Sequence, residues 1–487
     1  MKKNRKIAIT VIVIMISAIT VFFMYFYMQV SRREIPVISS IQVGKTLYYD
    51  SNTNKHYYDS DFTQAPQKVS DILNKAFLDN KGKNVDILVP AGDYLLDKPL
   101  VLQNGARLVG VSGKTRFIID DTFDRNYNDY IITNAPDAQV SISNIYVEYK
   151  GYKTPAFSDT AQNPNGIEGI MLKISKTTKA TITNSGFVAK YNGIKTKITP
   201  IWFRDGYSNV DIHDCYIENT SGSDTAGGCI WFMNNNGNIG DTVNVYNNTI
   251  VKNSHDEAIA VWGYNGSHLN YSIYNNTINY AKGVTNTVCD SLIAVWSQDD
   301  GSGLYKNIKF SNNIINLTGI SRRVFVVNIM KAKFENVVIE NNNITESVGD
   351  STSNTLLPAF EVLSSTLPTE LTAESTYLRG DVSINNNSFT NTSPYGRRCF
   401  AAVTSALLKL NGNKVNSNFG YSVIWEEDGN AKIMSTGNDY NYSGTGKANF
   451  AFIKGANTKA YFNSDKIALG ETSTNRSNLS FTNCTFR

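Results

Sequence analysis

VYNNTI, at residues 245–250, is one copy of a six-residue pattern that recurs along the chain. The pattern is an apolar residue, any residue, Asn, two further residues and a second apolar residue. Its copies are ISNIYV from Ile142, ITNSGF from Ile182, IHDCYI from Ile212, VYNNTI from Val245, IYNNTI from Ile273, FSNNII from Phe310, IENNNI from Ile339, INNNSF from Ile384, LNGNKV from Leu410 and FTNCTF from Phe481. From Asn144 to Asn386 the central residues are 28 to 45 positions apart. This spacing is too irregular for an α-solenoid and favours a coil with constant strands and variable loops.

The central residue is Asn in every copy but two, which have Asp214 and Gly412. It indicates a turn, because Asn tolerates a left-handed backbone and bonds to its own neighbours. Stacked coils would place these Asn side chains in a ladder with rungs about 4.8 Å apart. A second pattern, which alternates as a strand does, lies between the turns: CIWFM from Cys229, AIAVW from Ala258, LIAVW from Leu292, VFVVN from Val324, AFEVL from Ala359 and CFAAV from Cys399. These strands share one inward position, occupied by Ile230, Ile259, Ile293, Phe325, Phe360 and Phe400. The sequence therefore predicts an all-β solenoid.

The segment before the repeats adds a cap and a family resemblance. Residues 65–77 carry apolar residues at helical spacing, which predicts a short helix that covers the open end of the solenoid. The following PAGDYLLDKPLVL and ARLVGV resemble the first coils of the pectin-lyase-like superfamily, which includes pectate lyases, polygalacturonase-like hydrolases and phage tailspike depolymerases. The resemblance implies a right-handed parallel β-helix, a single-stranded solenoid, with a carbohydrate-active groove on one face. It does not imply one reaction.

The N-terminus predicts a membrane anchor. Residues 7–28 form an apolar run of 22 residues, long enough to cross a hydrocarbon core of roughly 30 Å as one helix. The larger cationic cluster precedes the run, which places the N-terminus in the cytoplasm. A cleaved signal peptide is the alternative, although no A-x-A-like site ends the run. We therefore expect a cytoplasmic tail at 1–6, a transmembrane helix at 7–28, an extracytoplasmic stalk at 29–60 and a β-helix at 61–487, with the bulk of the chain outside the cell membrane.

Charge and cysteine content narrow the classes of partner. The chain has 46 Lys and Arg against 42 Asp and Glu, so no polybasic surface indicates nucleic-acid binding. The five cysteines lie far apart without a metal-ligand spacing, and their odd number excludes a complete disulfide framework. The sequence still allows one disulfide bridge, for example between Cys215 and Cys229. The oligomeric state is not predicted.

Alignment of the strands by their inward position predicts one column of charged residues. Asp256, Asp290, Arg322 and Arg397 occupy it on different coils, and the two carboxylates would lie about 5 Å apart. Carboxylates at this distance repel, so either one is protonated or a cation lies between them. The first case gives an acid and a base or nucleophile for glycoside hydrolysis. The second gives a Ca²⁺ site on Asp256 and Asp290, as in the pectate lyases that the superfamily contains. A purely structural pairing with Arg322 is the alternative.

The segment NSHDEAIAVWG, residues 253–263, resembles the paired-acid motif G-D-D-[AC]-I-A-I of polygalacturonase-like hydrolases. The resemblance places Asp256 and Glu257 at the two acids, and His255 replaces the glycine. The family's N-T-D is absent one coil earlier, where Asn234, Asn235 and Asn236 stand, and no G-H-G or R-I-K follows at family distance. A standard polygalacturonase mechanism is therefore not expected.

Trp262 and Trp296 share one outward position on successive coils, and exposed indoles stack against the apolar faces of sugar rings. Asp299 and Asp300 follow Trp296 in a loop and would accept hydrogen bonds from hydroxyl groups, and Arg397 completes the predicted substrate-binding set. A Trp column covered by a loop or by another subunit is the alternative.

These features predict a membrane-anchored enzyme that cleaves or modifies an extracellular polysaccharide, such as a capsule or exopolysaccharide. The reaction is hydrolysis or β-elimination, with Asp256, Glu257, Asp290, His255 and Arg322 as the catalytic candidates and Ca²⁺ as the one candidate cofactor. A non-catalytic β-helix that binds glycan or serves as a surface scaffold is one alternative. A uronate C5-epimerase-like reaction is another.

Overall fold

The computed structural model describes most of the chain from residue 67 to residue 486, together with residues 40–42, 47–50 and 55–58. The gaps between 67 and 486 are residues 121–122, 124–129, 151–168, 192, 194, 224–225, 234, 236–239, 264–265, 282–287, 298–302, 320, 330–331, 349–357, 364–379, 394–396, 404–406, 418–422, 427–430, 443–449, 456 and 469–477. The predicted membrane span at 7–28 lies outside the described residues. Within the described part of the chain, no helix is long and apolar enough to span a bilayer.

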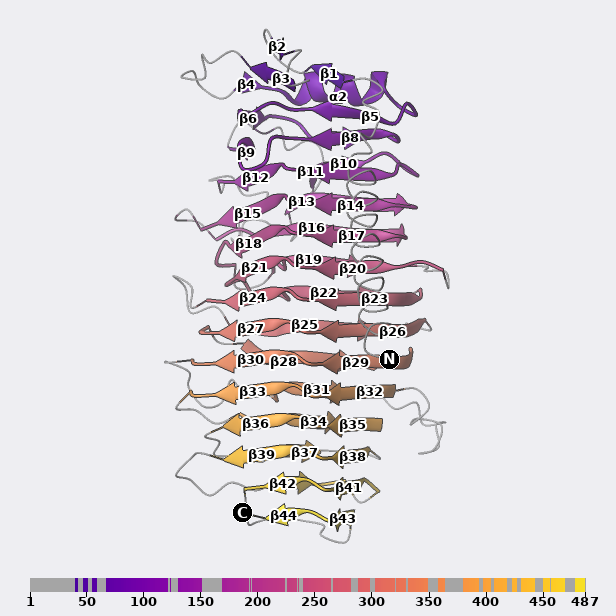
Figure 1. Cartoon of the computed structure of the whole chain (residues 1–487), viewed down its shortest axis with the longest axis vertical. Helices are drawn as coiled ribbons and strands as arrows, with labels where there is room; N and C mark the ends of the chain where they lie inside the picture. Colours follow the sequence, from indigo (N-terminus) through magenta and orange to yellow (C-terminus); the bar gives the residue numbers. More distant parts are fainter. Residues whose placement is uncertain are drawn as a thin grey trace, which may run out of the picture.

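The chain winds into a column of stacked coils, and each full coil contributes one strand to each of three sheets (Figure 1). Sheet 1 has 15 strands: β1 (Ser40–Gln42), β5 (Val85–Leu88), β8 (Ala106–Val109), β11 (Val140–Ser143), β14 (Ala180–Thr183), β17 (Val210–His213), β20 (Val243–Tyr246), β23 (His268–Tyr274), β26 (Leu304–Ser311), β29 (Lys333–Glu340), β32 (Gly380–Asn385), β35 (Leu407–Asn411), β38 (Lys432–Thr436), β41 (Lys459–Asn463) and β43 (Leu479–Thr482).

Sheet 2 has 12 strands: β7 (Leu100–Leu102), β10 (Tyr130–Asn134), β13 (Gly169–Thr177), β16 (Ile198–Tyr207), β19 (Ile230–Met233), β22 (Ile259–Gly263), β25 (Cys289–Ser297), β28 (Ser321–Asn328), β31 (Phe360–Leu363), β34 (Phe400–Val403), β37 (Ile424–Glu426) and β40 (Ala451–Ile453).

Sheet 3 has 15 strands: β4 (Gln67–Lys68), β6 (Gly92–Leu96), β9 (Thr115–Ile119), β12 (Tyr146–Tyr149), β15 (Gly186–Lys190), β18 (Tyr216–Thr220), β21 (Thr249–Lys252), β24 (Thr277–Tyr280), β27 (Ile314–Leu317), β30 (Asn343–Glu346), β33 (Ser388–Asn391), β36 (Lys414–Ser417), β39 (Asp439–Tyr442), β42 (Lys466–Ile467) and β44 (Thr485–Phe486). All pairings in the three sheets are parallel, which confirms the predicted parallel β-helix and fits the right-handed coil that the family resemblance implied.

The strand pattern read from the sequence sets the register of sheet 2. Ile230 pairs with Ile259, Ile259 with Ile293, and the column continues through Phe325, Phe360 and Phe400. These side chains are at most 2% exposed and belong to one continuous core inside the coil. Phe325 and Phe360 stack face to face with ring centroids 5.4 Å apart. The predicted shared inward position is confirmed.

The turn between sheets 1 and 3 has the left-handed residue that the repeat predicts. Asn247, Asn275 and Asn312 all have φ of 56°. The ladder, however, is formed by the next residue, so its predicted position was wrong by one. Each buried amide donates to the side-chain oxygen on the following coil over 2.9–3.1 Å, in the order Asn248, Asn276, Asn313, Asn342, Asn387, Asn413, Asn438 and Asp465. The left-handed residue lies at the outside of the corner between the two sheets, where Asn247 is exposed, and the side chain of the next residue, Asn248, is buried.

The N-terminal end is covered as predicted. Helix α2 (Ser70–Asp79) buries Leu73, Ala76 and Phe77 against the first coil, where it lies beside β7. Ser70 Oγ accepts hydrogen bonds from the backbone N–H groups of Asp97 and Lys98, which fixes the start of the helix. Within the segment predicted as a stalk, β1 joins sheet 1 beside β5, and β2 (Leu47–Asp50) pairs antiparallel with β3 (Lys55–Tyr58).

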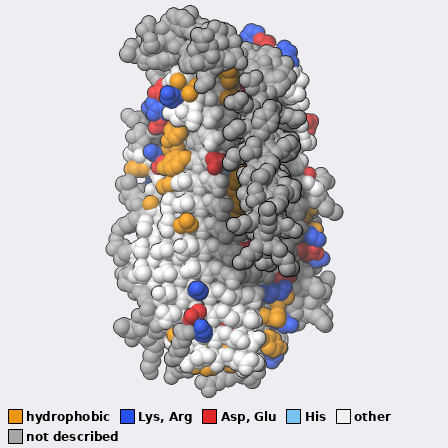
Figure 2. Space-filling view, viewed as in Figure 1, with side chains coloured by type: hydrophobic (Ala, Val, Ile, Leu, Met, Phe, Trp, Pro, Cys, Tyr) orange, Lys and Arg blue, Asp and Glu red, His pale blue; other side chains and the backbone are white. Residues whose placement is uncertain are grey.

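The described surface is mostly polar and uncharged. On the face shown in Figure 2, Lys and Arg side chains lie beside Asp and Glu side chains in small groups. Ion pairs of the described surface include Lys98 with Asp71 and Lys409 with Asp381. All five cysteines are free thiols, and the bridge that the sequence left open between Cys215 and Cys229 is not formed.

We predict that Asn313→Ala destabilises the fold by about 3 kcal/mol, because buried groups that lose a hydrogen bond cost about 1–3 kcal/mol each. Asn313 donates to Asn342 Oδ1 and to the backbone oxygen of Ile273, and accepts from Asn276. Urea unfolding would measure the change. Asn316→Ala, which removes a half-buried amide that bonds to Asn279, should cost less than about 1 kcal/mol. Equal losses in the two variants would contradict the role of the ladder.

Candidate active site

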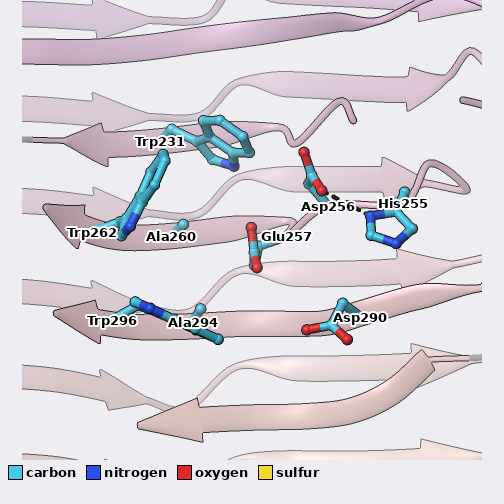
Figure 3. A pocket seen from close by; sticks show the side chains of 9 residues that line it. All are labelled: Trp231, His255, Asp256, Glu257, Ala260, Trp262, Asp290, Ala294 and Trp296. Atoms are coloured by element: carbon cyan, nitrogen blue, oxygen red, sulfur yellow. Dashed lines mark hydrogen bonds and ion pairs between the residues drawn. The ribbon is translucent and has the colours of Figure 1, made fainter. Parts of the chain in front are cut away.

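A pocket of about 250 Å³ opens on the outer face of sheet 2, over β19, β22 and β25. In Figure 3, tryptophan side chains lie toward one end of the pocket and carboxylates toward the other, with two alanines between them. The lining residues are Trp231, His255, Asp256, Glu257, Ala260, Trp262, Asp290, Ala294 and Trp296. The structure therefore brings together four of the five predicted catalytic residues and both predicted tryptophans.

The acidic end of the pocket is built from the bend that precedes β22. The backbone N–H of His255 donates to the carbonyl of Ser223 on the preceding coil over 3.0 Å. The backbone N–H of Asp290 on the following coil donates to the carbonyl of His255 over 3.0 Å. The bend is thus held by both neighbouring coils, and residues 255–257 present their side chains to the pocket instead of alternating between faces.

Asp256 is held by two partners. The backbone N–H of Gly227 donates to Asp256 Oδ2 over 3.1 Å, and His255 Nδ1 lies 2.9 Å from Asp256 Oδ1. The hydrogen bond to Asp256 raises the pKa of His255, against the opposing effect of burial. His255 and Asp256 therefore form a fixed pair at the edge of the pocket, with the carboxylate oriented as an acceptor.

Glu257 lies deeper in the pocket than its neighbours. The residue is only half-buried as a whole, but its carboxyl group is enclosed, and burial raises its pKa to about 7. The negative charge of Asp256 adds to this rise, whereas the hydrogen bond from Ser291 Oγ to Glu257 Oε1, 3.1 Å long, opposes it. Near neutral pH this carboxyl group therefore exchanges a proton readily, as a general acid must.

Asp290 is engaged by two arginines of the following coil. Arg323 Nη1 lies 3.2 Å from Asp290 Oδ2, and Arg322 Nη1 lies 3.4 Å from Asp290 Oδ1. Arg323 also pairs with Glu361 one coil further on. The structural pairing that the sequence left open for Asp290 is therefore present, so Asp256 and Glu257 carry the chemistry we assign to this end of the pocket.

The aromatic end depends on a residue that the sequence analysis missed. Trp231 is in register with Ala260, and Ala260 with Ala294, so two small side chains leave space beside the indole. A Cβ on Gly228 would come within 2.0 Å of Trp231 Nε1, so glycine is required for this ring position. Trp231 meets Trp262 edge to face at 5.7 Å between ring centroids. The succession Trp, Ala, Ala at the third position of the aligned strands was the available signal.

The structure places the other predicted substrate contacts elsewhere. Arg397 is fully buried inside the coil and pairs with Glu346 over 2.8 Å, so it lies apart from the pocket. The strand β34 begins at Phe400, and residue 397 therefore precedes the segment in which strand alternation holds. Asp299 and Asp300 lie outside the described residues. Arg322 is half-exposed and contacts the site through Asp290.

The donor set does not fit a bound Ca²⁺ ion. Calcium takes six to eight oxygen ligands. Asp290 already faces two guanidinium groups, and Asp256 is bonded to His255 and to a backbone N–H. In the described ranges, no three His, Cys, Asp or Glu side chains form a group able to hold a metal ion. The mechanism proposed below therefore has no calcium-dependent step.

The fold and the pocket define a parallel β-helix protein with an acidic and aromatic surface site. No protein-family model and no curated protein matches the chain. Among solved structures it is similar to a tailspike protein mutant of E. coli bacteriophage HK620 in complex with a pentasaccharide, at 11% identity over 87% of this chain and 77% of that one, with a TM-score of 0.48. It is also similar to the family 28 exopolygalacturonase of Yersinia enterocolitica, at 11% identity over 88% and 77%, TM-score 0.45. A third similar structure is the Streptococcus pneumoniae surface protein and adhesin PfbA, with 11% identity over 87% of this chain and 98% of that chain and a TM-score of 0.35. We argue function from the site alone.

We predict that Glu257 titrates near pH 7 and that Asp256→Asn moves this titration to lower pH. The direction follows because the charge of Asp256 contributes to the raised pKa of Glu257. The ¹³C shift of the carboxyl carbon would report it, with the resonance assigned by its loss in Glu257→Gln. Ser291→Ala removes a bond to the carboxyl group and should shift the titration upward. A midpoint near pH 4.5 would contradict the enclosed position of Glu257.

Proposed function

We propose that this protein is a glycoside hydrolase that cleaves an extracellular polysaccharide in the pocket on sheet 2. The observation that carries the proposal is the enclosed carboxyl group of Glu257, whose pKa burial raises to about 7, next to the hydrogen-bonded carboxylate of Asp256 in one pocket. Two carboxyl groups with different environments are what acid-assisted cleavage of a glycosidic bond requires. The tryptophans beside them supply the surface for the sugar.

In this mechanism Glu257 donates its proton to the glycosidic oxygen as the bond to the sugar breaks. Asp256 either takes a proton from the attacking water or attacks the sugar itself. His255 fixes the orientation of Asp256 through the 2.9 Å contact. The anomeric configuration of the first product, followed by proton NMR, would separate the two roles of Asp256, because retention requires the covalent route and inversion the water.

The size of the pocket fits a short stretch of glycan. Glu257 and Trp262 are five residues apart, a span of at most about 17 Å along the strand. Ala260 and Ala294 form the floor between them. Trp231 is 6% exposed and its Nε1 is buried against Gly228, so its ring gives the pocket an apolar wall and not a hydrogen-bond donor. We infer that the tryptophans hold one sugar while Glu257 acts on its linkage.

Hydrolysis accounts for this site better than the alternatives of β-elimination and epimerisation. Both alternatives need a base beside a uronate and a cation that stabilises its carboxylate. In the described lining there is no Lys or Arg, and Arg323 is already shared between Asp290 and Glu361. We further propose that residues 7–28 anchor the enzyme, so that it acts outside the membrane.

Glu257→Gln should lower the rate of cleavage at least 100-fold, because positioned general acids contribute about 10²–10⁴. In the unmodified protein, kcat should fall as pH rises through about 7, since Glu257 then loses the proton that it donates. Reducing ends released from the producing cell's own polysaccharide would measure both effects, with the full chain in detergent. Glu335→Gln, on the far sheet 1 beside Lys306, should retain full activity. Undiminished cleavage by Glu257→Gln would refute the assignment.

Trp262→Ala and Trp296→Ala should each weaken glycan binding about tenfold, because each removes an aromatic surface worth about 0.5–1.5 kcal/mol beyond its buried area. Calorimetry with the Glu257→Gln background would measure affinity without cleavage. Tyr461→Ala, which removes a 44% exposed ring from sheet 1, is the control and should bind normally. Unchanged affinity in both tryptophan variants would show that the glycan binds elsewhere.

A further inference from the structure

A lysine lies completely buried behind the site. Lys252, the last residue of β21 in sheet 3, is 0% exposed. Its Nζ donates to the backbone oxygen of Ser254 and lies 3.1 Å from Ser254 Oγ. The ring of Tyr280, its neighbour on the next coil, is 5.6 Å from Nζ. Within the described part of the chain no carboxylate forms an ion pair with it, and an ammonium group buried in this way is costly.

The contacts of Lys252 lead directly to the bend that carries the carboxyl groups. Ser254 Oγ donates to the backbone oxygen of Gly227, and the N–H of Gly227 donates to Asp256. Ser254 is followed by His255, Asp256 and Glu257 in the chain. Lys252 and Ser254 therefore fasten the bend from inside the coil, while neighbouring coils hold its backbone from above and below.

Lys252 is also a positive charge set behind two acids. It lowers the pKa of Glu257 and of His255, in both cases against larger causes, and it opposes the rise that burial causes in the pKa of the Cys229 and Cys289 thiols. The titratable groups around Lys252 and Glu257 are Cys229 on the coil before, His255 and Asp256 in the bend, Cys289 and Asp290 on the coil after, and Tyr280 in sheet 3.

We propose that Lys252 is a positioning residue of the active site: its buried ammonium fixes the Ser254 bend and places a positive charge behind the carboxyl groups that the bend carries. The inference rests on the function proposed for Glu257. It assigns to Lys252 no contact with the substrate. A lysine that merely filled space would leave the titration of Glu257 untouched when replaced by an uncharged side chain of similar length.

Lys252→Met tests the proposal in the full chain. Removal of the positive charge makes ionised Glu257 less favourable, so the ¹³C titration midpoint of its carboxyl should rise above 7 by on the order of one pH unit. The pH at which the cleavage rate falls should rise by the same amount. Lys409→Met removes a half-exposed lysine that pairs with Asp381 on sheet 1 and should leave the midpoint unchanged.

Lys252→Gln keeps the test decisive if the methionine variant fails to fold, since Gln can still donate to the backbone of Ser254. It should show the same upward shift of the Glu257 midpoint. A folded variant of either kind whose midpoint matches that of Lys409→Met would overturn the proposal. The titration needs no substrate, so this failure is distinct from failure of the proposed hydrolase, which would appear as undiminished cleavage by Glu257→Gln.

Discussion

The register between successive coils is the constraint on which the rest of the structure depends. One left-handed residue turns the chain from sheet 1 to sheet 3, and the buried amide that follows it bonds to the same position on the next coil. A slip of one residue would leave these amides without partners and would reverse every side chain in the adjoining strands. Insertions are therefore confined to the loops, which vary in length while the strands superimpose.

This register brings residues that are far apart in the sequence next to one another on successive coils. Asp256 and Asp290 are 34 residues apart, yet a backbone bond joins their coils at His255 and both side chains line one pocket. A cavity on the outside of a parallel sheet also needs small residues, because side chains in register otherwise fill the surface. Ala260 and Ala294 meet that need beside Trp231. The aromatic wall and its floor are thus consequences of the same alignment.

Period-two alternation made the inward column and the outward position of Trp262 predictable from sequence, because both lie within strands. The alternation fails outside strands. It placed Arg397 with the site, although that residue precedes β34 and turns inward to Glu346. The turn pattern assigned the ladder to the left-handed Asn, whereas the next residue forms it. Trp231 was missed because its place in the pocket depends on the space that two alanines on later coils leave beside it.

The pKa of Glu257, in contrast, could not be predicted from its position along the chain. Asp256 and Glu257 are adjacent acids, and only their surroundings make them different. Asp256 lies at the bend and meets the backbone N–H of Gly227 and an imidazole, whereas the carboxyl group of Glu257 is enclosed and meets its own backbone N–H and the Ser291 hydroxyl. Burial without full compensation raises the pKa of Glu257 to about 7. The positive charge proposed for Lys252 opposes this effect of burial. A buried lysine behind the bend therefore has a chemical reason to exist inside the coil.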